Sequence, residues 1–147
     1  MRSHCKGRAG YPADILFERD GVKIGFYVVR PKEILAVHLS IPEGKSLTFM
    51  SSYIRLLSEN GDQQHYPETI HGYRSNPYSV QKLALSDRLS FRGGIYGYYS
   101  IRFKLPLLEI SEFTLQTPRF VINDTEQTIS DIKYVLKTGW YFYPLNC

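Results

Sequence analysis

The chain has 147 residues, of which 43% are hydrophobic and 22% are charged, and this composition excludes the disordered and collagen-like classes. The formal net charge of +4 permits a polyanionic partner, but the cationic residues are spread along the chain, which argues against nucleic acid. No run approaches the roughly 18 apolar residues that a membrane-spanning helix needs. Twelve tyrosines against two methionines and one tryptophan favour a sheet protein.

Residues 1–11 carry three cationic side chains, two glycines and few apolar residues, so they have little surface to bury. We expect them to form a flexible N-terminal arm. Residues 12–147 are predicted to form one domain, because a single core is comfortable at roughly 100–200 residues and no low-complexity linker divides the chain.

The first predicted element is a β-hairpin that joins residues 13–19 to residues 22–30. Its turn is Asp20-Gly21, and both residues tolerate the positive φ angles of a type I′ turn. In residues 35–41 large apolar side chains occupy the odd-numbered positions, and the even positions hold Ala36, His38 and Ser40. This alternation predicts a half-buried strand whose odd-numbered residues face the core.

Residues 46–58 are apolar on both faces of an extended chain, which predicts a central strand. Residues 59–79 contain many turn-forming residues and no sustained periodicity, so we expect a recognition loop. Because structureless stretches of this length are uncommon in compact domains, a short strand at residues 69–73 is predicted inside it.

Residues 80–85 and 88–92 are predicted to be short strands, and Gly93-Gly94 then turns the chain into residues 95–105. Those residues alternate cleanly, which predicts one core face and one wet face. The predicted wet face carries Tyr96, Tyr98, Ser100, Arg102 and Lys104.

The last predicted strands are residues 110–116, 119–122, 132–137 and 140–143, with a turn at Asn123-Asp124. Eight to ten strands without βαβ alternation predict an all-β fold. We expect a single-domain antiparallel β-sandwich, either immunoglobulin-like or jelly-roll-like, and a small β-barrel is the alternative.

No motif predicts catalysis, a cofactor or a metal site. Gly44-Lys45-Ser46 resembles the end of a phosphate-binding loop, but the required glycine five residues earlier is Leu39. His65, Glu68 and His71 lie close together in sequence, but loop spacing does not place three ligands on one side as a helix would. We therefore expect a non-catalytic protein without cofactors.

Cys5 and Cys147 are the two cysteines, at opposite ends of the chain. Since the ends of a domain often lie close together, a disulfide between them is reasonable and would imply an oxidising compartment. Two unpaired thiols are the alternative. We therefore expect a periplasmic or secreted protein, with a cytoplasmic location as the second option.

Two sets of residues have the composition of a recognition surface, because tyrosine and arginine are enriched where proteins bind one another. The candidates are His65, Tyr66, Tyr73, Arg74 and Tyr78 from the loop, and Tyr96, Tyr98 and Arg102 from the wet face. The alternative is that these tyrosines pack on their own sheet. The sequence thus predicts an extracytoplasmic protein that binds an unidentified protein partner. A glycan-binding or single-stranded nucleic-acid-binding domain is the second hypothesis.

Overall fold

The protein is an all-β sandwich. The computed structural model describes residues 15–29, 34–59, 61–75, 78–105, 112–129, 131–136 and 140–144. Within these residues the chain forms three antiparallel sheets and no helix, and none of the sheets closes on itself. The predicted sandwich is confirmed, and the alternative of a small closed barrel is wrong. In the part of the chain that the structure describes, no helix has the length and apolar character to cross a membrane.

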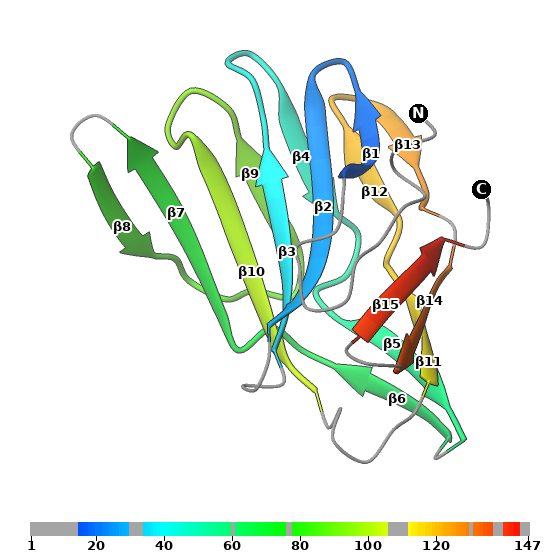
Figure 1. Ribbon diagram of the computed structural model, residues 1–147. Coiled ribbons are helices and arrows are strands. Elements are labelled where there is room, and N and C mark those ends of the chain that lie inside the picture. Colours follow the sequence, from blue (N-terminus) through cyan, green and yellow to red (C-terminus); the bar gives the residue numbers. More distant parts are fainter. Residues whose placement is uncertain are drawn as a thin grey trace.

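The largest sheet has six strands and forms one layer of the sandwich (Figure 1). In spatial order its strands are β1 (Ile15–Arg19), β2 (Val22–Val29), β3 (Ile34–Ser40), β10 (Tyr98–Lys104), β7 (Thr69–Ser75) and β8 (Tyr78–Lys82). β10 pairs with β3 on one side and with β7 on the other, although both are distant in sequence. The edge strands are β1 and β8.

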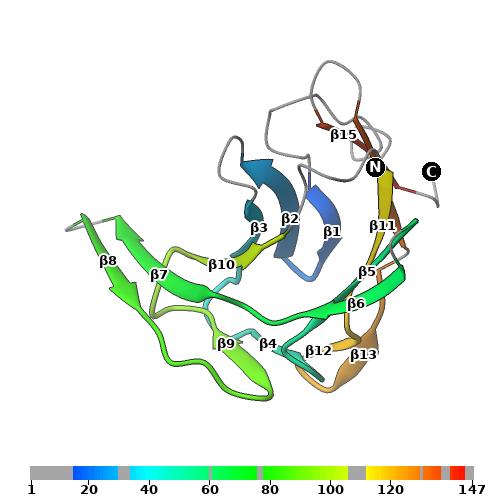
Figure 2. The same cartoon turned by 90° about the horizontal axis from the view of Figure 1, so that it is seen from below.

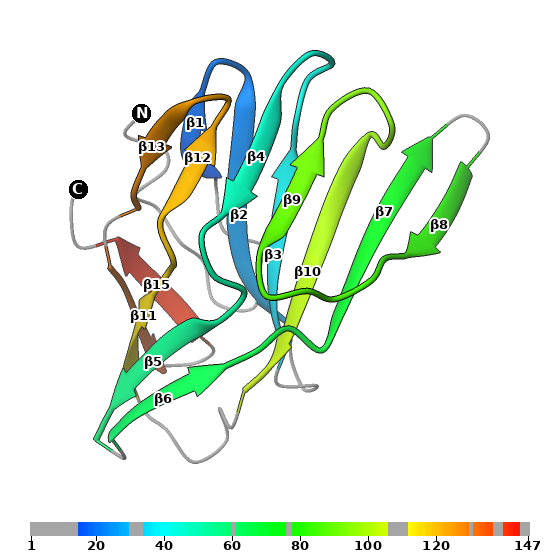
Figure 3. The ribbon, with the colours of Figure 1, turned by 180° about the vertical axis from the view of Figure 1, so that it is seen from behind.

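A four-stranded sheet lies over the six-stranded sheet as the second layer (Figures 2 and 3). Its strands are β13 (Thr125–Gln127), β12 (Phe120–Ile122), β4 (Ser46–Phe49) and β9 (Leu89–Arg92). A five-stranded sheet contains β15 (Trp140–Pro144), β14 (Ile132–Leu136), β11 (Glu112–Gln116), β5 (Ile54–Ser58) and β6 (Gly61–His65). The chain bends between β4 and β5 and between β11 and β12, and the Met50 N–H donates across this bend to the carbonyl of Arg119 at 2.8 Å.

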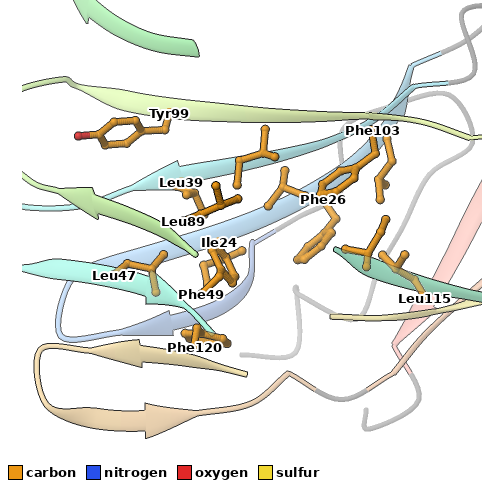
Figure 4. Packing of buried hydrophobic residues seen from close by; sticks show 14 of the residues in the cluster. Ile24, Phe26, Leu39, Leu47, Phe49, Leu89, Tyr99, Phe103, Leu115 and Phe120 are labelled. Carbon is orange, nitrogen blue, oxygen red and sulfur yellow. The ribbon is translucent and has the colours of Figure 1, made fainter. Parts of the chain in front are cut away.

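The hydrophobic core fills the space between the sheets, because alternate residues of each strand point inward. Inward-facing side chains from all three sheets meet there (Figure 4), and they include Ile24, Phe26, Leu39, Leu47, Phe49, Leu89, Phe103, Leu115 and Phe120. β7 and β8 extend beyond β9, the edge of the second layer (Figures 1 and 3). As a result, all five residues of β8 are exposed.

Several predicted elements are confirmed. Asp20 and Gly21 have φ angles of 53° and 82°, as the turn between β1 and β2 requires. Leu35, Val37 and Leu39 are buried. The strand predicted at residues 132–137 is present as β14, although its apolar spacing also fits a helix, because β-branched and aromatic residues favour extended backbone.

Several predictions differ from the structure. The strand predicted at residues 80–85 is shifted, because β8 starts at Tyr78 and ends at Lys82. Residues 46–58 form two strands in two sheets, because the chain bends after Phe49. Residues 59–79 contain β6, all of β7 and the first two residues of β8, so this segment is largely sheet and only partly loop. β10 starts at Tyr98 and not at residue 95, because the residues just before it form the turn that follows β9. The predicted N-terminal arm and both cysteines, Cys5 and Cys147, lie outside the described residues.

Candidate functional site

The exposed end of the six-stranded sheet carries a group of tyrosines on its outer face. Tyr73 of β7 lies between Tyr98 of β10 and Val80 of β8 in the ladder. Since Ile70 and Tyr99 on these strands point into the core, the side chains of this row point away from it. Tyr78 shares the face of Val80, two residues away. We call Tyr73, Tyr78, Val80 and Tyr98 the tyrosine face.

Three of the four side chains of the tyrosine face are exposed, and Tyr73 is half-buried. Tyr78 is 72% exposed, Val80 45% and Tyr98 40%. Partial burial raises the pKa of Tyr98 above its ordinary value, and the nearby Tyr73 and Tyr78 raise it further. The Tyr98 hydroxyl can donate a hydrogen bond to a partner.

The aromatic rings on this side of the sheet are in contact with one another. The rings of Tyr73 and Tyr98 stack with centroids 4.5 Å apart and an interplanar angle of 8°. The ring centroids of His38 and Tyr98 lie 5.7 Å apart, and those of His71 and Tyr73 lie 6.3 Å apart. Because the two tyrosines stack on each other, each has one ring face covered by its neighbour.

Tyr96 lies on the opposite side of the sheet, which corrects the predicted wet face. A Cβ atom on Gly72 would lie 2.7 Å from the Tyr96 ring, and Gly72 has the inward parity of Ile70. The Tyr96 hydroxyl donates to Gln81 Oε1 at 2.6 Å, and the Arg74 guanidinium lies 5.0 Å from the ring centroid. Tyr96 and Arg74 therefore support the exposed end of the sheet from its inner side.

Five of the six strands of the sheet that carries the tyrosine face contain no acidic residue. β2, β3, β7, β8 and β10 have no aspartate or glutamate in their sequences. Their cationic residues are Lys23, Arg74, Lys82, Arg102 and Lys104. In the six-stranded sheet, only β1 carries a carboxylate, that of Glu18. The strands of this sheet therefore carry a net positive charge.

A row of polar residues crosses the outer face beside the tyrosines. Ser100 of β10 lies between His38 of β3 and His71 of β7 in the ladders. Ser100 is completely buried, and among the described residues its Oγ atom, Nδ1 of His71 and Nε of Arg102 have no hydrogen-bond partner. A serine between two histidines suggests a nucleophile, but a substrate cannot reach a fully buried hydroxyl.

Burial lowers the pKa of His38 below its ordinary value, and the charge of Arg102 lowers it further. The unfolded chain therefore binds a proton at this histidine more readily than the folded chain does, and folding stability should fall as the pH drops below about 6.5. We expect the unfolding temperature to decrease between about pH 7.5 and 5.5, and to decrease less in His38→Gln. Thermal unfolding followed by circular dichroism checks this. An equal decrease in both proteins would assign the effect to other groups, of which His65 is the first, since burial lowers its pKa too.

The remaining predicted site residues lie elsewhere. Arg102 shares the outer face with Tyr98 but pairs with Ala36 and Thr69, further along β10. His65 ends β6 in the five-stranded sheet, where its Nε2 atom lies 3.2 Å from Gln63 Oε1. Tyr66 follows it, is 60% exposed and lies 5.7 Å from the ring of Tyr53. The tyrosine face therefore includes Tyr73, Tyr78 and Tyr98 of the predicted set, but not His65 or Tyr66.

The histidines of the rejected metal site do not converge with acidic groups. Among the described residues, no three His, Cys, Asp or Glu side chains lie where they could hold a metal ion together. His65 and His71 belong to different sheets, and the chain between them bends at Glu68.

A pocket that the sequence did not indicate lies where β4 bends into β5 and β11 into β12. Its volume is about 390 Å³, and its lining residues are Met50, Ser51, Tyr53, Arg55, Gln116, Thr117, Pro118 and Arg119. Both arginines already form ion pairs, Arg55 with Asp62 and Arg119 with Glu126. The pocket therefore offers little uncompensated charge. No local sequence signal could have found it, because it joins two bends that are distant in the chain.

A scan against protein-family models and a search of curated proteins found no match to this chain.

Proposed function

We propose that this chain is a non-catalytic interaction protein that recognises another protein through the tyrosine face. The observation that supports this most is the exposure of Tyr78, Val80 and Tyr98 on one sheet face that projects beyond the second layer. Tyrosine provides a large, stiff contact surface with a polar tip, so it binds at a low cost in conformational entropy. The two stacked rings restrict each other further.

The proposal includes an extracytoplasmic location, which depends on a disulfide between Cys5 and Cys147. Mass spectrometry with and without reduction tests this part, because a disulfide lacks two hydrogen atoms, a difference of about 2 Da. An unchanged mass after reduction would remove the support for an oxidising compartment.

A single-stranded nucleic acid is the second candidate, because four strands of the six-stranded sheet, β2, β7, β8 and β10, carry cations and no carboxylate. Base stacking requires open aromatic faces, however, and Tyr73 and Tyr98 cover one face of each other. We therefore favour a protein partner. Affinity that falls steeply with salt for an oligonucleotide would reverse this preference.

Replacing Tyr98 with alanine should weaken partner binding by about 30-fold or more, because interface hot spots contribute at least ~2 kcal/mol. The measurement is photocrosslinking in extract of the source cells, with p-benzoylphenylalanine in place of Val80. We expect a specific adduct that disappears in Tyr98→Ala and in Tyr73→Ala.

The control position for the crosslinker is Asp124, which is exposed at the turn between β12 and β13 in the other layer. Equal adducts from Asp124 and Val80, or an adduct that is unaffected by both tyrosine substitutions, would contradict the proposal. Circular dichroism of each variant verifies that the sheet is intact.

A further inference from the structure

Strand β8 is an open edge of the six-stranded sheet. It pairs with β7 on one side, and no other described strand pairs with it (Figure 1). All five of its residues are exposed. Proteins usually protect such edges with proline, bulges or charged side chains. β8 has none of these before Lys82, its last residue, and its register with β7 is regular.

Two hydrogen bonds show which backbone groups of β8 face outward. The N–H of Leu83, just after β8, donates to the carbonyl of Ile70 at 2.8 Å. Counting back from Leu83, the backbone N–H and C=O groups of every second residue of β8 also point toward β7. The Tyr73 carbonyl accepts from Gly97 on the β10 side, so Tyr73 and its partner Val80 do not bond each other. The backbone groups that face the open edge therefore belong to Tyr78, Val80 and Lys82.

The charge of the sheet selects the occupant of this edge. β7, β8 and β10 carry Arg74, Lys82, Arg102 and Lys104 without a carboxylate. Two copies of this chain that paired edge to edge would bring two cationic sheets together, which costs free energy. A segment with carboxylates avoids that cost, and alternate apolar side chains on it would contact Tyr78 and Val80 on the outer face.

We propose that β8 receives an extended, acidic segment of the protein partner as an additional strand of the six-stranded sheet. This inference rests on the proposed function and specifies how the partner is held. Backbone hydrogen bonds to Tyr78, Val80 and Lys82 supply affinity, while the tyrosine face and Lys82 select the side chains of the added strand.

The test is Val80→Pro. Proline removes the outward N–H of Val80 and leaves the bonds between β7 and β8, so an edge strand should tolerate it. The matched control is Val80→Thr, which keeps the N–H and the β-branched shape. The probe is an acetylated and amidated heptapeptide of alternating glutamate and valine, added to the full chain at millimolar concentration, and the measurement is amide NMR.

We expect the amide signals of β8 to shift and their hydrogen exchange to slow. Affinity should fall about tenfold or more in Val80→Pro and stay near wild type in Val80→Thr. Absence of these shifts, or equal shifts with lysine in place of glutamate, would overturn the inference. Hydrogen-exchange protection of β8 that increases with protein concentration in the absence of peptide would also overturn the inference. In that case a second copy of this chain would occupy the edge.

The photocrosslinked partner separates this inference from the proposed function. For this comparison p-benzoylphenylalanine replaces Tyr78, so that position 80 is free to vary. If the adduct persists in Val80→Pro but disappears in Tyr98→Ala, the inference of an added strand is wrong and the proposed protein-binding function stands. Absence of any specific adduct would remove the proposed function itself.

Discussion

Truncation of Phe120 to alanine is expected to lower the free energy of unfolding by about 3–5 kcal/mol. Phe120 of β12 is fully buried at one end of the core cluster (Figure 4). Its ring lies 4.9 Å from that of Phe17 on the opposite layer and 5.7 Å from that of Phe49 on the neighbouring strand. The substitution therefore leaves a cavity that both layers line. β12 and β4 are hydrogen-bonded to strands on both sides, so they cannot collapse into it.

Urea unfolding followed by circular dichroism measures this effect. The matched control is Ile95→Ala, since Ile95 is 50% exposed and its truncation should change stability by no more than about 0.5 kcal/mol. A loss below about 1 kcal/mol for Phe120→Ala would mean that the two layers do not pack as described.

Gly93→Ala should destabilise the protein by about 1–3 kcal/mol or more, because it places an atom where backbone already lies. A Cβ on Gly93 would lie 1.8 Å from the carbonyl oxygen of Pro42. The Gly93 N–H also donates to the Lys45 carbonyl at 3.0 Å, so the chain after β9 is held against the loop between β3 and β4. Since the clash is with backbone, no side-chain rotation relieves it.

Gly97→Ala is the matched control, because its Cβ would meet the Tyr73 carbonyl at 3.5 Å, an ordinary contact. The unfolding temperature of Gly97→Ala should equal or slightly exceed that of the wild type, because alanine lowers the conformational entropy of the unfolded chain. Equal unfolding temperatures for the two alanine variants would show that the contact at Gly93 is looser than described.

The proposed site illustrates where alternation in the sequence succeeds and where it fails. It succeeds for Tyr98 and Arg102, which share the outer face of β10 as predicted. It fails for Tyr96, because two-residue periodicity holds only in extended chain, and residues 93–97 form a turn. The neighbours of Tyr98 could not be predicted at all, because Tyr73 reaches it through pairing of β7 with β10.

The amino-acid sequence by itself determined the all-β class, the Asp20-Gly21 hairpin and the inward residues of β3, because turn chemistry and two-residue alternation act over a few neighbouring residues. Only the tertiary structure decided that β4 and β5 belong to different sheets, that Tyr73 stacks on Tyr98, and that β8 is an open edge. These features depend on strand order, and strand order follows from how distant segments bury their apolar faces together.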